Sequence, residues 1–359
     1  MHTNFLRQTF PRYARTPLYG ACAALLLLIS IASGAHGAGV WTKQKSNTLA
    51  WLHAVYFVDA QKGWAAGGNG ALLTTDDGGM MWRTLHRPTE DTLRDIYFSD
   101  AQNGWLVCER SIFLLKTEDE PRSYLLRTTD GGATWRRLNI AGANPSERFV
   151  RIAFTEQGTR GWAFGEAGAL FATRDGGLTW FRQLAPTRRL LLGGAFLDAN
   201  TGWIVGAGST ILRTSDSGDT WNAANLSDTP RERLNAVSFV DAARGWAVGA
   251  SGRILSTING GRTWRTQTSN TTTDLYDVKF ADQAEGWAVG ADGVVLHTTT
   301  GGASWTIEQS TTTHPLERLF LAGRTRGWAI GLGGTIIAFG IPDGTSPKTV
   351  PQLKPGAAR

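Results

Sequence analysis

The 359-residue sequence contains very little cysteine: Cys22 and Cys108 are its two copies. Cys22 stands at the start of the main apolar run of an N-terminal segment that has the features of a leader. Cys108 is then the single cysteine of the remaining chain, which excludes an intramolecular disulfide even in the oxidising compartments reached by export. The stability of the fold therefore has to come from packing.

Charged residues are also scarce, at 18%, while hydrophobic residues reach 42%, a composition typical of a globular protein with a large core. The formal net charge is +6, but three of these charges (Arg7, Arg12 and Arg15) precede the first acidic residue and belong to the N-terminal segment. Without them the charge is about +3 (6 minus 3). A balance this mild does not indicate nucleic-acid binding, and we expect none.

Catalytic and metal-binding signatures are missing as well. The six histidines are scattered, no zinc spacing of Cys and His occurs, and neither a G-x-S-x-G elbow nor a P-loop is found. Sialidases use a tyrosine nucleophile with an arginine cluster, but their Arg-Ile-Pro segment is absent near this N-terminus. We predict no enzymatic activity, no metal and no cofactor; a sialidase-like glycoside hydrolase or a glycan-binding protein is the alternative.

The one long apolar run lies at the N-terminus, over residues 21–32. It is shorter than the roughly 20 residues needed to span a membrane, follows a basic stretch and precedes small residues at 33–39. These features predict a signal peptide over residues 1–38, cleaved near 35–38, and export to a periplasm or a compartment like the thylakoid lumen. An uncleaved anchor is the alternative. Residues 341–359 are rich in proline and predict a flexible tail.

Glycine and tryptophan, by contrast, are abundant, with 44 and 15 copies, and they recur periodically. A Gly-Trp pair occurs seven times, at intervals of 41, 57, 41, 43, 41 and 41 residues. A V-x-F alternation precedes most pairs and a short apolar run ending in Thr follows them, which predicts four short strands per repeat. We expect the Gly to let the chain turn into the second strand. The pattern predicts an all-β, seven-bladed β-propeller over residues 39–340. The paired tryptophans are Trp64, Trp105, Trp162, Trp203, Trp246, Trp287 and Trp328.

Six repeats also carry a Ser/Thr-x-Asp-x-Gly-x-Thr-Trp segment, such as TSDSGDTW at 214–221. We expect Asp216 to accept backbone N–H groups in a tight turn, Gly218 to supply a positive φ, and Trp221 to begin the outer strand and pack inward. Asn259 and Thr300 replace the aspartate in two repeats, which favours a structural brace over a metal or catalytic role. The other residues of these segments are Asp77, Asp130, Asp175, Trp82, Trp135, Trp180, Trp264 and Trp305.

The last repeat lacks such a segment. Trp41, near the start of the propeller, has the spacing to the next Gly-Trp pair that the missing tryptophan would have. Trp41 precedes Trp64 by 23 residues, the same spacing as between Trp180 and Trp203. We predict that a strand over residues 41–44 pairs as the outer strand of the last blade, at 316–340, and so closes the ring.

The second repeat is longer than the others, with 30 residues from Trp105 to Trp135 where the other five have 18. The extra 12 residues lie within 108–129, where two apolar runs flank a charged centre. This pattern predicts an extended hairpin between the second and third strands. A protruding contact element and a tolerated loop insertion are both open interpretations.

The Asp-containing segment resembles the Asp-box, or BNR repeat, of sialidases and related propellers. The whole repeat resembles the photosystem II stability/assembly factor family, and residues 234–264 match its pattern almost position for position. The resemblance covers about residues 40–340. It implies an exported, non-enzymatic, seven-bladed scaffold, because the plant and cyanobacterial members bind newly made reaction-centre protein. We therefore expect a monomer with a membrane-associated protein partner, and peripheral association with the membrane is open.

The family's binding surface is described as an arginine-rich face, and arginines lie on or beside several first strands here. First strands line the channel of a propeller, so some arginines could converge on one rim and pair with carboxylates. Equivalent positions carry Leu192, Asn235 and Tyr276, so scattered solvated arginines are the alternative. The candidate partner-binding residues are Arg94, Arg151, Arg188, Arg189, Arg231, Arg233 and Arg318.

Overall fold

The computed structural model describes residues 40–140, 142–155, 158–224, 226 and 232–340. The predicted signal peptide at 1–38 and the predicted tail at 341–359 lie outside these residues. Within them, no helix has the length and apolar character needed to cross a membrane.

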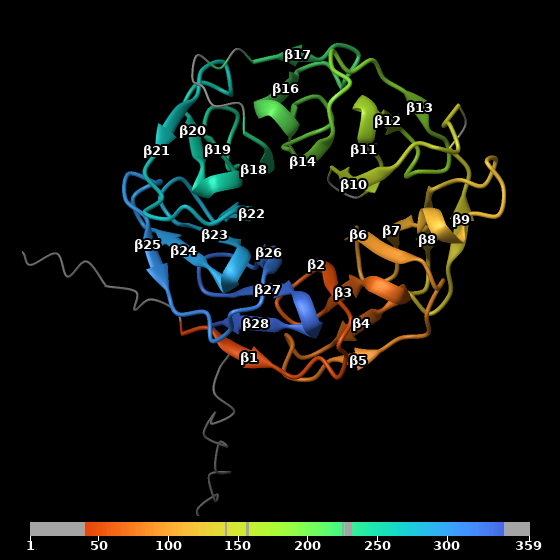
Figure 1. The fold of residues 1–359 in the computed structure, drawn as a ribbon, viewed down its shortest axis with the longest axis horizontal. Coiled ribbons are helices and arrows are strands. Elements are labelled where there is room, and N and C mark those ends of the chain that lie inside the picture. The colour runs from red at the N-terminus through yellow and green to blue at the C-terminus, as the bar shows by residue number, and fades with distance from the viewer. Residues whose placement is uncertain (1–39, 141, 156–157, 225, 227–231, 341–359) are drawn as a thin grey trace, which may run out of the picture. The chain divides into compact units, whose positions relative to one another are not determined.

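The described strands form seven four-stranded antiparallel sheets arranged radially around a central axis (Figure 1). In each sheet the first strand is innermost, because its residues line the central channel, and the last strand is outermost. The prediction of a seven-bladed β-propeller is confirmed.

The first four blades follow the chain without interruption. Blade 1 consists of β2 (Leu52–Phe57), β3 (Gly63–Gly67), β4 (Leu72–Thr75) and β5 (Arg83–Thr84). Blade 2 consists of β6 (Thr92–Phe98), β7 (Gly104–Glu109), β8 (Ser123–Thr128) and β9 (Arg136–Leu138). Blade 3 consists of β10 (Phe149–Phe154), β11 (Gly161–Gly165), β12 (Leu170–Thr173) and β13 (Phe181–Arg182). Blade 4 consists of β14 (Leu191–Phe196), β15 (Gly202–Gly206), β16 (Thr210–Thr214) and β17 (Asn222–Ala223).

The remaining blades lead back to the start of the chain. Blade 5 consists of β18 (Leu234–Phe239), β19 (Gly245–Gly249), β20 (Ile254–Thr257) and β21 (Arg265–Gln267). Blade 6 consists of β22 (Leu275–Phe280), β23 (Gly286–Gly290), β24 (Val295–Thr298) and β25 (Thr306–Glu308). Blade 7 consists of β26 (Leu316–Leu321), β27 (Gly327–Gly331), β28 (Ile336–Phe339) and β1 (Thr42–Gln44). Short 3-10 helices join second to third strands: η1 (Gly68–Gly70), η2 (Ile112–Leu114), η4 (Glu166–Gly168), η5 (Ala207–Ser209), η6 (Ala250–Gly252), η7 (Ala291–Gly293) and η8 (Leu332–Gly334).

The closure of the ring takes the predicted form. Strand β1 pairs antiparallel with β28, with Thr42 opposite Ala338 and Gln44 opposite Ile336. Trp41, just before β1, is completely buried, and its ring lies edge-on to Phe339 at 4.8 Å. The first and last segments of the propeller therefore form one blade, and the edge of β28 is covered.

Glycine is required in each Gly-Trp pair for a different reason from the one we expected. It is the first residue of the second strand and has no positive φ, and a Cβ added to Gly202 would lie 2.2 Å from the ring of Phe196. That ring in turn stacks on Trp162 of the preceding blade, with centroids 3.9 Å apart. Glycine is therefore required because it leaves room for the aromatic ring that seals the seam between two blades.

The insertion in blade 2 extends the hairpin of the second and third strands only slightly, with one further backbone bond from Arg110 N–H to the carbonyl of Arg122 at 2.8 Å. Strands β7 and β8 pair over six residues, from Gly104 opposite Thr128 to Glu109 opposite Ser123, which is little longer than in the other blades. Most of the extra residues form a loop around η2. The three apolar residues of η2 are 56%, 90% and 62% exposed, in the order of the sequence.

Candidate binding site in the central channel

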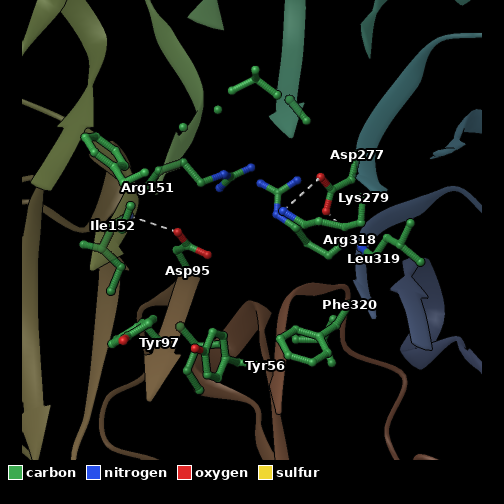
Figure 2. Close-up of a pocket in the computed structure, with 18 of the residues that line it drawn as sticks. Tyr56, Asp95, Tyr97, Arg151, Ile152, Asp277, Lys279, Arg318, Leu319 and Phe320 are labelled. Carbon is green, nitrogen blue, oxygen red and sulfur yellow. Dashed lines mark hydrogen bonds and ion pairs between the residues drawn. The ribbon is translucent and has the colours of Figure 1, made fainter. Parts of the chain in front are cut away.

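The central channel holds a cavity of about 390 Å³ that is lined by the first strands of the blades (Figure 2). Each first strand contains a bulge directly after its leading apolar residue, where its register against the second strand shifts. A bulge re-aims the side chain that follows it. The seven residues that follow the bulges are Ala54, Asp95, Arg151, Gly193, Ala236, Asp277 and Arg318.

The two aspartates of this set join neighbouring blades. The backbone N–H of Ile152 donates to Asp95 Oδ2 at 2.9 Å, and that of Leu319 donates to Asp277 Oδ2 at 3.0 Å. Their residues are only 9% and 2% exposed, and burial raises the pKa of both carboxyl groups, against the opposing effect of nearby cations. Each carboxylate therefore holds the first strand of the next blade in place.

The two arginines of this set have carbonyl partners and no carboxylate partner in the described part of the chain, and one of these contacts is a long 3.4 Å bond from Arg151 Nη1 to the carbonyl of Arg94 in the neighbouring blade. Arg151 and Arg318 extend toward one another from opposite sides of the channel (Figure 2). Arg151 Nη1 donates to the carbonyl of Val150 at 2.7 Å, and Arg318 Nη1 donates to the carbonyl of Glu317 at 2.8 Å. Arg318 Nη2 is buried without a hydrogen-bond partner. Among the described residues, neither guanidinium forms an ion pair with a carboxylate.

A third cation and a group of aromatic rings complete the lining. Lys279 Nζ lies 3.8 Å from Asp277 Oδ1. The ring of Tyr56 lies between Tyr97 at 4.9 Å and Phe320 at 5.2 Å, on the side of the cavity away from the guanidinium groups (Figure 2). Burial raises the pKa of Tyr56, so this phenol stays neutral. The channel thus combines a cationic part with an aromatic part.

Arg94 lies on β6 at the rim, and its charge is neutralised there. It pairs with Glu109, which also binds Arg148 at 2.7 Å. Arg148 also forms an ion pair with Glu166 at 2.9 Å, and Arg122 pairs with the same carboxylate at 2.8 Å. This network joins blades 2 and 3 at the rim, and Arg94 is not a free cation for a partner.

The other described arginines of the predicted set do not line the cavity. Arg188 and Arg189 are exposed in the loop before β14, where Arg189 Nη1 donates to the carbonyl of Gly208 at 2.6 Å. Arg233 precedes β18 and pairs with Asp274 at 3.2 Å. Arg231 lies outside the described residues. From the predicted set, the structure thus brings together Arg151 and Arg318, and it does not bring the other described members, Arg94, Arg188, Arg189 and Arg233, to them.

Sequence reasoning missed Asp95, Asp277, Lys279 and the aromatic residues of the channel. A signal for the aspartates was present, since the third position of the L-x-x-V-x-F pattern reads Ala, Asp, Arg, Gly, Ala, Asp and Arg through the seven repeats. Reading that position as one column would have placed its charged residues in one ring of the channel.

The Asp-box residues form turns on the outer part of the blades. Asp216 Oδ1 accepts from the Thr214 hydroxyl at 2.8 Å and from the backbone N–H of Thr220 at 2.9 Å, while Gly218 has a φ of 82°. Trp221 is buried, and β17 begins one residue after it. The same bonds recur at Asp77, Asp130, Asp175 and Asn259, and in weaker form at Thr300.

The channel does not have the layout of a sialidase site. Among the described residues that line it there are two arginines, not three, and there is no glutamate beside a tyrosine. Tyr97 has its ring against Tyr56, and its hydroxyl donates to the carbonyl of Thr155 at a long 3.4 Å.

A seven-bladed ring, braced by Asp-box turns and closed by its N-terminal strand, defines a β-propeller of the BNR type. The family model described as "Photosynthesis system II assembly factor YCF48" matches residues 80–185, 183–268 and 229–317. The protein belongs to this family.

Individual relatives are more distant. "Photosystem II assembly lipoprotein Ycf48" from Synechococcus sp. (strain CC9902) is 27% identical over 128 residues, which are 35% of this chain and 34% of the relative. The match thus spans about a third of that relative's length.

Among solved structures, "YCF48 bound to D1 peptide" and "YCF48 from Cyanidioschyzon merolae" each have a TM-score of 0.68 at 20% identity, covering 84% of this chain and 97% or 98% of theirs. A GH74 enzyme from Niastella koreensis has a TM-score of 0.64 at 14% identity, covering 85% of this chain and 54% of its own. At these identities the likeness shows the fold alone.

Proposed function

We propose that the protein is an exported, non-enzymatic scaffold that assists the assembly of a membrane-associated protein by holding a carboxylate-bearing segment of it in the channel. The observation that carries this proposal is the pair Arg151 and Arg318, which face one another without an ion-pair partner among the described residues. Two similar proteins support this proposal: one relative is called an assembly lipoprotein, and one solved family member is bound to a D1 peptide.

The physical argument rests on the cost of an unpaired buried cation. Arg318 Nη2 is buried without a partner, and leaving a buried polar group unsatisfied costs about 1–3 kcal/mol, more for a charged group. A ligand carboxylate would remove this cost, because guanidinium groups bind carboxylates in a planar, two-bond arrangement. The adjacent rings of Tyr56, Tyr97 and Phe320 offer an apolar surface for a neighbouring side chain of the same segment.

The channel aspartates support a role without catalysis. Asp95 and Asp277 are buried, and each is held by a backbone N–H of the next blade. A carboxylate that serves as acid, base or nucleophile must instead reach the substrate. With both side chains engaged between blades, the channel is suited to binding, and its rigid walls present the site preformed.

The proposal is tested by affinity capture from detergent-solubilised membranes of the host, with mass spectrometry of the bound proteins. We expect one membrane protein to be enriched on the wild-type chain at least tenfold over the double variant Arg151→Met/Arg318→Met. The matched control is Arg136→Met/Arg265→Met, which removes two exposed arginines from outer strands and should retain the partner. Equal capture by both double variants, each with an unchanged melting temperature, would overturn the channel as the binding site.

A panel of fluorogenic glycosides tests the proposal that the protein has no glycosidase activity. We expect no turnover above that of a heat-denatured sample. Turnover that disappears in the Asp277→Asn variant would instead assign the channel to glycoside hydrolysis.

A further inference from the structure

The seam between blades 6 and 7 contains a histidine enclosed by two glutamates. His297, on β24, has Nε2 3.3 Å from Glu285 Oε1 and Nδ1 2.9 Å from Glu308 Oε1. The glutamate side chains are only 11% and 7% exposed. The imidazole also stacks on Trp287, with centroids 4.5 Å apart. This is a nearly buried cluster of three titratable groups that the proposed function does not use.

The cluster is joined directly to the closure of the ring. Glu308 Oε2 accepts a hydrogen bond of 2.8 Å from Trp41 Nε1. Trp41 is completely buried and is followed at once by β1, the strand that completes blade 7. His297, Glu308 and Trp41 therefore form a chain of polar contacts from blade 6 to the closing strand.

The residue opposite the Gly-Trp tryptophan on the third strand, the position of His297, is a permanent cation in blades 2 and 4 and a small residue in blades 1, 3, 5 and 7. Arg127 is paired in register with Trp105 in blade 2, and its guanidinium lies 5.5 Å from that ring. Arg213 has the same place beside Trp203 in blade 4. In blade 6 the corresponding residue is one whose charge can change near neutral pH.

Protonation decides how many of the cluster's contacts can form. An imidazolium has two N–H donors and can bind both glutamates, whereas a neutral imidazole has one donor and must leave one carboxylate facing a lone pair. Glu285 has a second cation nearby, because Arg324 Nε lies 3.8 Å from its Oε2 while also binding Asp282. Glu308 has none among the described residues: its Oε2 accepts from Trp41 Nε1, and its buried Oε1 lies 2.9 Å from His297 Nδ1 and has no hydrogen-bond partner of good geometry. Loss of the imidazole proton therefore weakens mainly the contact between His297 and Glu308.

We propose that His297 is a proton-controlled latch of the propeller: its imidazolium holds Glu308 in place against Trp41, and loss of the proton loosens the closing strand β1. The result is a ring whose closure responds to the pH of the compartment that holds the protein. This proposal does not depend on the partner or on the channel arginines.

The direction of the effect follows from the electrostatics. Burial disfavours the charged imidazole, but the hydrogen bonds and charges of Glu308 and Glu285 outweigh it and raise the pKa of His297 above its ordinary 6.5. A raised pKa in the folded state stabilises the protein fully below about 6.5, and this stability is lost as the pH rises through the folded value. The ring should thus be most firmly closed in mildly acidic solution.

Hydrogen exchange measured by mass spectrometry between pH 5.5 and pH 9, with correction for the intrinsic rates, tests the latch. In the wild-type chain we expect protection of the peptide containing Thr42–Gln44 to fall at least tenfold across this range relative to strands of blade 4. In His297→Arg the charge is permanent, so protection should stay high at every pH. In His297→Gln it should be low and nearly independent of pH. The control His86→Gln removes an exposed histidine and should behave as wild type.

An NMR titration of the wild-type protein keeps the proposal testable if a variant fails to fold. The imidazole signals of His297 and the indole N–H signal of Trp41 should titrate with the same midpoint, above 6.5. A Trp41 signal that does not follow His297, or a closing strand whose protection is independent of pH in wild type, would overturn the latch.

Discussion

Phe57 in blade 1 stacks on Trp328 in blade 7, with ring centroids 3.7 Å apart and ring planes 16° from parallel. The same arrangement joins consecutive blades, as between Trp64 and Phe98 at 3.6 Å. The seam that closes the ring is therefore built like a seam within the chain. What distinguishes blade 7 is its outer strand, which comes from the N-terminal end of the propeller.

Deleting residues 40–46 should open blade 7. The deletion removes the completely buried Trp41 and exposes the edge of β28, so we expect a loss of about 3–5 kcal/mol, the usual cost of losing a buried tryptophan side chain. The melting temperature should fall by roughly 10 °C. Thermal unfolding followed by circular dichroism measures this, and Trp41→Ala should account for most of the loss. An unchanged melting curve would contradict closure by β1.

Substituting Gly202 by alanine should disrupt the seam between blades 3 and 4. The added Cβ would lie 2.2 Å from the ring of Phe196, and overpacking of this kind costs about 1–3 kcal/mol. The control is Gly68→Ala, where the nearest atom would be 3.8 Å away. Chemical denaturation measures both. In a Phe196→Ala background the cost of Gly202→Ala should shrink, and equal costs in the two backgrounds would contradict the steric explanation.

The fold could be predicted because a propeller is periodic and its strand pairs are local in sequence. The 23-residue spacing between Trp41 and Trp64 was enough to assign the closing strand. The reason for the glycines could not be found in this way, since the ring that excludes a side chain at Gly202 is brought there by packing.

The candidate site was less predictable. Arg94 and Arg318 both lie near the start of a first strand, yet Arg318 follows the bulge and lines the channel, whereas Arg94 lies at the bulge itself and is neutralised by Glu109 on the neighbouring strand. Pairing between charges depends on side-chain directions that composition does not contain. The sequence could therefore indicate a pool of candidate arginines, but not which of them stay unpaired.

Removing an Asp-box carboxylate should weaken a blade without affecting the channel. Asp216→Ala deletes the acceptor of bonds from Thr214 and Thr220, and at about 0.5–1.5 kcal/mol per hydrogen bond we expect a loss of about 1–2 kcal/mol. Hydrogen bonds from Thr220 lower the pKa of Asp216, so its stabilisation is present above the ordinary value of 3.8 and disappears as the pH falls below it. The difference in melting temperature between wild type and variant should therefore narrow in acid. A difference that persists at pH 2 would contradict this account.

Introducing an aspartate at Thr300, where the segment of blade 6 lacks one, tests the same kind of turn. Thr300 accepts the N–H of Ser304 at 2.9 Å, but its hydroxyl lies a long 3.3 Å from that of Thr298. Thr300→Asp should supply the two carboxylate oxygens found in blades 1 to 4 and raise the free energy of unfolding by about 0.5–1 kcal/mol. Chemical denaturation at pH 7 provides the measurement, and a destabilised variant would show that this turn has adapted to threonine.

Cys108 should be unreactive until the propeller unfolds, and it also reports whether the leader is removed. The thiol is completely buried on β7, and burial raises its pKa, so neither access nor ionisation favours attack on a reagent. We expect Ellman's reagent at pH 8 to label it only at the rate of unfolding, and rapidly in 6 M guanidinium chloride. The denatured mature protein should titrate one thiol, because Cys22 lies within the predicted signal peptide. Two thiols would mean that residues 1–38 are retained. Fast labelling of the native protein would mean that blades 1 and 2 separate locally, since Cys108 belongs to the core cluster that contains Leu72 of blade 1 and Tyr124 of blade 2.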